Sequence, residues 1–510
     1  MRCFGIQLCG IWLLSAIAIA IGQDRPQQTR VEIGHETTRL TEPLDVDGYI
    51  DFVQALDRRM AAGVTPDVNA EVPLAMLLRA SHVPKQQRDS YFSRLGSQPA
   101  DAESPRFVPL EEAVPNAGAK VLDLLRGFAF GEPSPVLTEI DKPNEWGPVA
   151  TKWVRRNERV LPELVKASKR TRYYSPVVST NSRAHGIVTP ELRGVRLLLE
   201  YASGDALVRN QPQQALEYAM TCRRLARLVA TGPLYRSYEQ ARVLEYSGLV
   251  IEHACLQTFP PTLAQFRERN REVAAMKKLP SITTVLDIGE RYRALSVACS
   301  VARGEDVGSL LQFDGAQYAS RFEKMMLKNV SRRIMEEDVD VNKVLRATND
   351  CYDRLIAEAT QETYPDPDEF YRIKLRRAKF RDTFPLLAGV KDADLSGALD
   401  DLIAMNVTFE IDWHFFARRT RTQRLLTDVG WALCAFYREN RRWPEQLGDL
   451  QPNFVKLLPA DPYSEKPFSY RKTQTGCLVY SVGPDGVSNA GDRRDIVLPL
   501  YTPTENSRAR

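Results

Sequence analysis

The chain has 510 residues, of which 43% are hydrophobic, so it is long enough to bury a sizeable core and does not have the composition of a disordered protein. Its 69 Lys and Arg residues nearly balance 65 Asp and Glu residues, and the two signs are interspersed. This balance argues against a nucleic-acid partner. The five histidines are too scattered for a short zinc-binding motif.

The amino terminus predicts export. Arg2 precedes an apolar run over residues 4–22 that ends in small residues, as before a signal-peptidase site. The run has about 19 residues, which at about 1.5 Å per residue nearly spans a ~30 Å hydrocarbon core. Residues 1–22 are therefore expected to form a cleaved signal peptide or a single N-terminal membrane anchor. Either outcome places the chain in the periplasm or cell envelope.

Residues 23–46 are polar, lack an apolar repeat and predict a linker. Beyond them, "DGYIDFVQALDRRM" and "AEVPLAMLLRASHV" have the spacing of helices. Proline-rich loops follow near residues 99–115 and 132–148. These loops are expected to connect short helices within one irregular helical region.

The central third has the strongest helical pattern. Apolar stripes over 192–206 and 215–229, with Pro212 starting the second helix, predict an antiparallel hairpin. The hairpin resembles a tetratricopeptide pair, although no 34-residue period is sustained. The same apolar spacing predicts further helices over residues 234–255, 263–279, 282–301 and 341–355.

The predicted fold is mainly α, an irregular helical array over residues 47–415 with a candidate division near residue 190. It is followed by a small α+β domain over 416–510, where a helical stripe precedes short alternating strands at 468–470 and 478–480. No nucleophile elbow, metalloprotease, phosphate-loop or dinucleotide motif occurs. The sequence therefore predicts a protein that is not an enzyme.

The six cysteines after the targeting segment are widely spaced and form no CxxC pair, which favours buried thiols. They are Cys222, Cys255, Cys299, Cys351, Cys434 and Cys477. Export also permits disulfides. Because Cys434 lies on the predicted terminal helix and Cys477 begins a strand that packs near it, a disulfide between these two is a hypothesis.

Three motifs carry a family resemblance: "ALCAFYRENRRWPEQLGDL", "LPADPY" and "YSVGPDGV" at 480–487, closed by Asp495 and Ile496. In this order they resemble the C-terminal part of the major pseudopilin, protein G, of bacterial type II secretion. The match covers about a sixth of the chain. The rest resembles large uncharacterised exported bacterial proteins with a helical region before such a domain.

The resemblance implies a structural calcium ion in the closing loop. Its ligands would be the Val482 carbonyl and the side chains of Asp485 and Asp492, with Asp495 sharing or replacing the role of Asp492. Calcium takes six to eight hard oxygens, and glycines let a loop turn sharply enough to present them. A metal-free polar turn is the alternative.

The chain departs from the family because no prepilin-peptidase motif lies in residues 1–23, so pilus-type polymerisation is not expected. The predicted function is an exported non-enzymatic scaffold or interaction protein with an unknown protein partner. The alternative is an exported hydrolase whose catalytic groups meet only in the fold. That alternative requires His185 or His253 to face a carboxylate and a nucleophile in a cleft.

Overall fold

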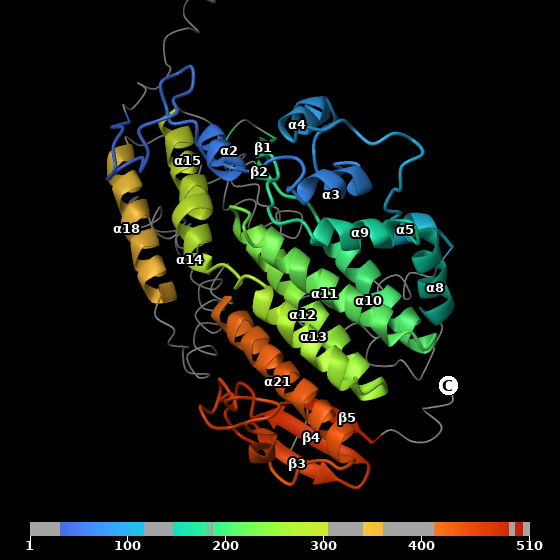
Figure 1. Cartoon of the computed structure of the whole chain (residues 1–510). Coiled ribbons are helices and arrows are strands. Elements are labelled where there is room, and N and C mark those ends of the chain that lie inside the picture. Colours follow the sequence, from blue (N-terminus) through green and yellow to red (C-terminus); the bar gives the residue numbers. More distant parts are fainter. Residues whose placement is uncertain are drawn as a thin grey trace, which may run out of the picture.

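The computed structural model describes residues 31–116, 146–180, 183, 187–303, 340–360, 413–488 and 495–502. These residues form a mainly helical molecule with a small antiparallel sheet near the C-terminal end (Figure 1). The predicted mainly α class is confirmed at this level. The predicted targeting segment, residues 1–22, lies outside the described residues.

Short helices and a two-stranded ribbon are found among the described residues before position 190. They are α2 (Phe52–Ala61), α3 (Glu71–Leu78), η1 (Lys85–Gln87), α4 (Arg88–Arg94), α5 (Leu110–Ala113), α8 (Trp146–Arg156), α9 (Val160–Ser168), β1 (Val178–Ser179) and β2 (Ile187–Val188). Asp51 caps α2 by accepting a hydrogen bond from the Gln54 N–H at 2.9 Å. Arg79, in the left-handed conformation at φ 55°, ends α3.

The central hairpin is confirmed as α10 (Arg193–Val208) and α11 (Pro212–Val229), with Pro212 in the first turn of α11. Next come α12 (Tyr235–Thr258) and α13 (Leu263–Ala275), which begins with a capping box. One hydrophobic cluster extends from α3 to α12 and includes residues on both sides of position 190. The short helices and the central hairpin therefore share a core.

The helix predicted over 282–301 contains an irregular segment. It is built from α14 (Ile282–Thr284), a π-helical segment η3 (Val285–Glu290) and α15 (Arg291–Ala302). A Cβ on Gly289 would lie 1.8 Å from the Pro233 carbonyl oxygen, so only glycine allows this approach. Within the same segment, the Glu290 Oε1 accepts a hydrogen bond at 2.7 Å from the Tyr235 N–H at the start of α12.

Residues 31–46, the described part of the predicted linker, lie against α15 and α18 (Val341–Thr360). The Asn349 Nδ2 donates to the carbonyls of Thr37 at 2.7 Å and Glu36 at 2.9 Å, and Arg303 forms an ion pair with Asp45. Thr37 is buried. This segment is therefore packed onto the helical region.

The C-terminal module consists of α21 (Trp413–Asn440), η5 (Leu447–Leu450) and an antiparallel sheet in the order β3 (Ser469–Thr473), β4 (Gly476–Ser481), β5 (Ile496–Tyr501). The strands β3 and β4 confirm the two predicted strands, whereas β5 was not predicted. Figure 1 shows α21 lying between the sheet and the helices α12 and α13.

The core of this module is shared with the helical region. Leu433 of α21 and Val479 and Leu498 of the sheet belong to the same buried cluster as Leu256 of α12 and Phe266 of α13. The hydrophobic effect that stabilises the module and the helices individually therefore also stabilises the contact between them.

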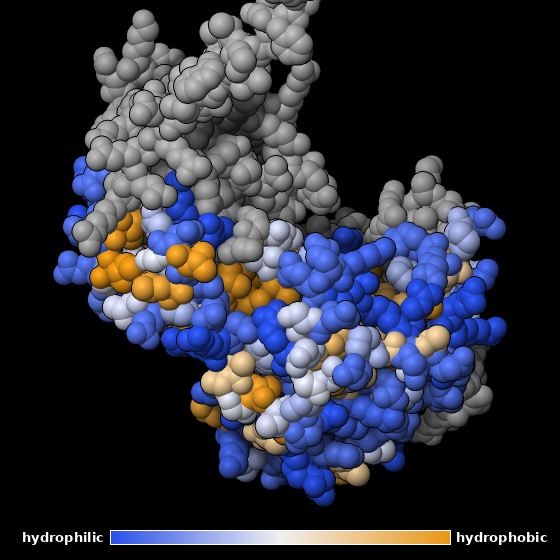
Figure 2. Space-filling view, turned by 90° about the horizontal axis from the view of Figure 1, so that it is seen from above, coloured by the Kyte–Doolittle hydropathy of each residue, from blue (hydrophilic) through white to orange (hydrophobic). Residues whose placement is uncertain are grey.

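The described cysteines are free thiols, and Cys434 and Cys477 are both buried. The hypothesis of a disulfide between them is wrong for this structure, whereas the expectation of buried thiols holds for five of the six, Cys351 being half-buried. Within the described part of the chain, no helix has the length and apolar character needed to cross a bilayer. The face in Figure 2 is mostly hydrophilic, with hydrophobic side chains gathered mainly in one area.

Candidate functional site

Three of the predicted calcium ligands, Val482, Asp485 and Asp495, are described and lie between the end of β4 and the start of β5. Val482 is buried, and Asp485 is exposed in a turn between Gly483 at φ 70° and Gly486 at φ 67°. Asp495 is buried directly before β5. Asp492 lies outside the described residues. The turn has the positive backbone angles that the glycine spacing predicted.

A carboxylate that sequence reasoning missed fixes the start of this loop. Asp461 is only 1% exposed, and its Oδ1 accepts hydrogen bonds from the Ser481 Oγ at 2.8 Å and the Tyr463 N–H at 3.0 Å. Its Oδ2 accepts from the Val482 N–H at 3.1 Å. Asp461 therefore positions the residue whose carbonyl was predicted to bind calcium. Asp461 is the aspartate of the "LPADPY" motif, so the family resemblance could have identified it as a residue of this loop.

The donor chemistry of the loop fits calcium, because Val482, Asp485 and Asp495 supply hard oxygens. These three residues provide fewer than the six to eight oxygens that calcium takes. Among the described residues, no group of three or more His, Cys, Asp or Glu side chains is placed to hold a metal ion. Further ligands from residues 489–494 or from water would be needed to complete the site.

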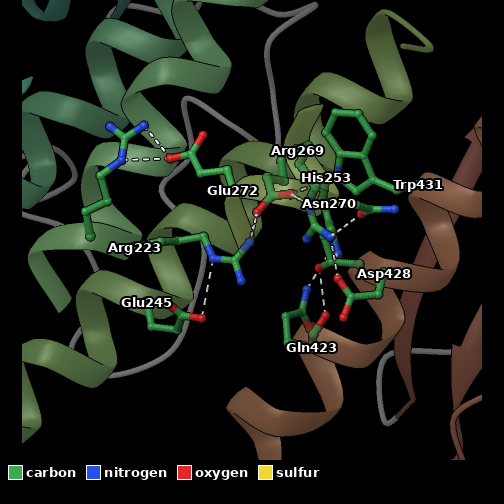
Figure 3. A network of polar contacts seen from close by, with 12 residues as sticks. Arg223, Glu245, His253, Arg269, Asn270, Glu272, Gln423, Asp428 and Trp431 are labelled. Carbon is green, nitrogen blue, oxygen red and sulfur yellow. Dashed lines mark hydrogen bonds and ion pairs between the residues drawn. The ribbon is translucent and has the colours of Figure 1, made fainter. Parts of the chain in front are cut away.

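A buried ionic network lies where the C-terminal module meets the helices, with residues of four helices in contact (Figure 3). Arg223 on α11 is fully buried and its Nη1 donates to the Glu252 Oε1 on α12 at 2.6 Å. Its Nε lies 3.4 Å from the Glu245 Oε1, and Glu245 lies two helical turns before Glu252 on the same face of α12. Arg227 donates to both oxygens of Glu245.

The second oxygen of Glu252 connects the network to α13 and α21. It accepts hydrogen bonds from the Arg269 Nε at 2.8 Å and from the Trp431 Nε1 at 2.7 Å. The Nη1 of Arg269 donates to the Asp428 Oδ1 at 2.5 Å. Burial alone would raise the pKa of Glu252, but Arg269 and Arg223 outweigh that effect and lower it. Glu252 is therefore an anion held between two cations.

The local sequence has features that allow this burial. Arg223 and Arg227 are one helical turn apart, and Glu245 and Glu252 are two turns apart, so each pair lies on one helix face. Between the two glutamates, a Cβ on Gly248 would lie 2.5 Å from the Arg223 Cγ. Gly248 therefore leaves room for the arginine stem between α11 and α12. Sequence reasoning did not identify this network.

His253, the histidine proposed for a hydrolase, is buried beside the network. Its Nδ1 lies 3.0 Å from the Gln423 Nε2 and its Nε2 lies 2.7 Å from the Thr427 Oγ1. The Thr427 hydroxyl donates to the Gln423 carbonyl at 2.7 Å, so His253 donates through Nε2 as a neutral ring. Burial lowers the pKa of His253 to about 4, with Arg269 acting in the same direction. His185 lies outside the described residues.

The arrangement around His253 does not provide an accessible nucleophile. Thr427 is fully buried, and both ring nitrogens of His253 already have partners on α21. A substrate would have to separate α12 from α21 to reach either group. The geometry therefore fits a structural contact between the helices and the module.

A second buried acid lies far from the module, at the start of α3. The Glu71 Oε1 accepts a hydrogen bond from the Tyr91 Oη at 2.6 Å, and the same hydroxyl lies 3.0 Å from the Ser175 Oγ. Burial raises the pKa of Glu71 to about 7, although Tyr91 and Tyr173 both act to lower it. No cation is paired with Glu71 among the described residues.

No protein-family model, curated protein or solved structure gives a significant match to this chain. What the protein does has to be inferred from its own residues.

Proposed function

We propose that this chain is an exported, non-enzymatic scaffold or interaction protein whose C-terminal module is pseudopilin-like and holds a structural calcium ion. The observation that carries the proposal is the position of α21. This helix is covered by the sheet on one side and by α12 and α13 on the other, with Glu252 hydrogen-bonded to Trp431 between them. The module serves as an integral end of a helical array.

The position of α21 also supports the absence of pilus-type polymerisation. In the pseudopilins that the module resembles, the corresponding helix assembles with helices of other subunits. Here Gly430 of α21 lies against Leu498 of the sheet and Leu256 of α12, and Leu433 of the same helix belongs to the same buried cluster. Assembly through this helix would expose a shared hydrophobic core, which is unfavourable by about 25 cal/mol for each Å² of apolar surface.

The non-enzymatic part of the proposal is supported by the described polar clusters. The carboxylates of the ionic network and both ring nitrogens of His253 are held by partners in neighbouring helices, whereas a catalytic group must reach its substrate. The alternative of an exported hydrolase would require a different set of residues from the one around His253.

The calcium site gives the test. We expect calcium to raise the melting temperature of the full chain, because an ion that binds only the folded state stabilises it by about 2.7 kcal/mol at 100 times its dissociation constant. Asp485→Ala should remove most of the rise. Glu439→Ala, which changes an exposed acid at the end of α21, should leave it intact. The same melting temperature with calcium and with a chelator would contradict the site.

The interaction role needs a separate measurement. The chain with an affinity tag should capture the same envelope protein from a membrane fraction in repeated experiments, and the purified pair should bind directly. A broad screen of hydrolase substrates should give no turnover. Turnover that survives purification and is lost with a point substitution would favour the enzyme.

A further inference from the structure

Arg424 of α21 stands out beside the ionic network because it lacks a partner among the described residues. Its side chain is half-buried, and no hydrogen bond or ion pair joins it to another described group. The acid one turn further along the helix, Asp428, is the expected partner at this spacing. Asp428 instead accepts from the Arg269 Nη1 at 2.5 Å. In the part of the chain that the structure describes, no acidic group therefore pairs with the Arg424 guanidinium.

The charges around Arg424 do not balance. It interacts electrostatically with Glu245, Asp428, Arg223 and Arg227. With Arg269, four arginines stand against the three acids Glu245, Glu252 and Asp428, so the group has one positive charge in excess.

The neighbouring ion pairs do not offset this excess. Lys169 and Arg224 are matched by Glu217 and Glu272, so that outer group is neutral by itself. Burial lowers the pKa of Arg424, and this effect together with the positive charges of Arg223 and Arg227 outweighs the opposite effect of Glu245 and Asp428. A half-buried cation in this setting is stabilised by an added negative charge.

The network also has donors without acceptors. The Nη2 atoms of Arg223 and Arg269 are both buried and have no hydrogen-bond partner among the described residues. A buried donor left unsatisfied costs about 1–3 kcal/mol. Guanidinium groups present their donors in a planar fork that matches the oxygens of an oxyanion. An oxyanion would therefore match both the excess positive charge and the unsatisfied guanidinium donors.

We propose that the junction of α11, α12 and α21 binds a small oxyanion, with Arg424 as its principal ligand and the excess charge of the arginine group holding it in place. The half-exposed side chain of Arg424 gives access from solvent, and the buried arginines supply the electrostatic attraction. Bound there, the anion would neutralise the group and fix α21 against α11 and α12. This site is separate from the proposed calcium loop.

The test is a titration of the full chain with inorganic phosphate, and separately with sulfate, at constant ionic strength in calcium-free buffer. We expect a saturable rise in melting temperature. Arg424→Gln should weaken the apparent affinity by about 10- to 100-fold, as expected for loss of a charged hydrogen-bonding group. Arg421→Gln, an exposed arginine on the same helix, should keep the saturable response.

Two results would overturn the proposal. Phosphate and sulfate stabilise many proteins by exclusion from their surface, so an unsaturated rise equal in all three proteins would show only that general effect. The second result comes from anion-free buffer, where removing an unpaired cation should leave the melting temperature of Arg424→Gln unchanged or higher. A lower value there, with no saturable response in the parent chain, would mean that Arg424 stabilises the fold without a ligand.

Discussion

The buried acid Glu71 offers a prediction whose sign and size both follow from the structure. Its carboxyl group is fully buried, accepts a hydrogen bond from Tyr91 and has a pKa raised to about 7, compared with 4.5 for an ordinary glutamate. The tyrosines that face it, Tyr91 and Tyr173, have their pKa values raised well above 10 by burial and stay protonated in the range considered.

The sign follows from proton counting. Between pH 4.5 and about 7 the folded chain keeps a proton on Glu71 that the unfolded chain has released. Stability therefore falls as the pH rises through this window, because the folded state binds more protons. A difference of about 2.5 pKa units corresponds to about 3 kcal/mol of destabilisation, fully present above pH 7 and absent below pH 4.5.

Glu71→Gln should remove this penalty, because the amide has nearly the shape of the protonated acid and its oxygen can still accept from Tyr91. We expect the variant to exceed the parent chain by about 3 kcal/mol at pH 8 and to equal it near pH 4.5. Urea unfolding at several pH values measures both. A difference that does not change with pH, or a less stable variant at pH 8, would refute the reasoning.

Two further predictions concern the contact between α12 and α21. Glu252→Gln should lower the free energy of unfolding by about 3–5 kcal/mol in urea melts, because it leaves two buried arginines without their shared anion; Glu439→Gln on the surface should have little effect. As the pH falls below 6.5, a histidine in the unfolded chain binds a proton, whereas buried His253 in the folded chain stays neutral until about pH 4. The free energy of unfolding should therefore decrease as the pH falls from 6.5 to about 4. His253→Gln should flatten the decline and His35→Gln should not, and equal slopes in both variants would contradict the assignment.

Much of the helical architecture could be predicted because apolar periodicity reports which face of a helix is buried. The hairpin of α10 and α11 follows from two stripes and from Pro212 between them. The π-helical segment was not predicted, because it accompanies the close approach of Gly289 to the Pro233 backbone, a contact between residues distant in sequence. The strand β5 was missed because Pro499 interrupts its alternation.

The ionic network escaped prediction for a different reason. Glutamates and arginines in a helix usually face solvent, so Glu245 and Glu252 have the pattern of a hydrated surface when α12 is considered alone. Their partners come from other helices, and Trp431 is 179 positions away from Glu252. Apolar periodicity identifies which face of a helix is buried, but it does not identify ion pairs between that face and other helices. Such pairs become visible only in the three-dimensional structure.

The network gives the module a defined position that hydrophobic contacts alone would not give. Apolar side chains such as Leu433 and Leu256 would tolerate a shift of α21 along its axis, since one turn exchanges one apolar contact for another. A shift of one turn moves a side chain by about 5.4 Å, which would take Trp431 and Asp428 out of reach of Glu252 and Arg269. Each separated group would then be buried without a partner, at a cost of several kcal/mol. We infer that the charged residues set the register of α21, whereas the apolar residues supply most of its attraction to the helices.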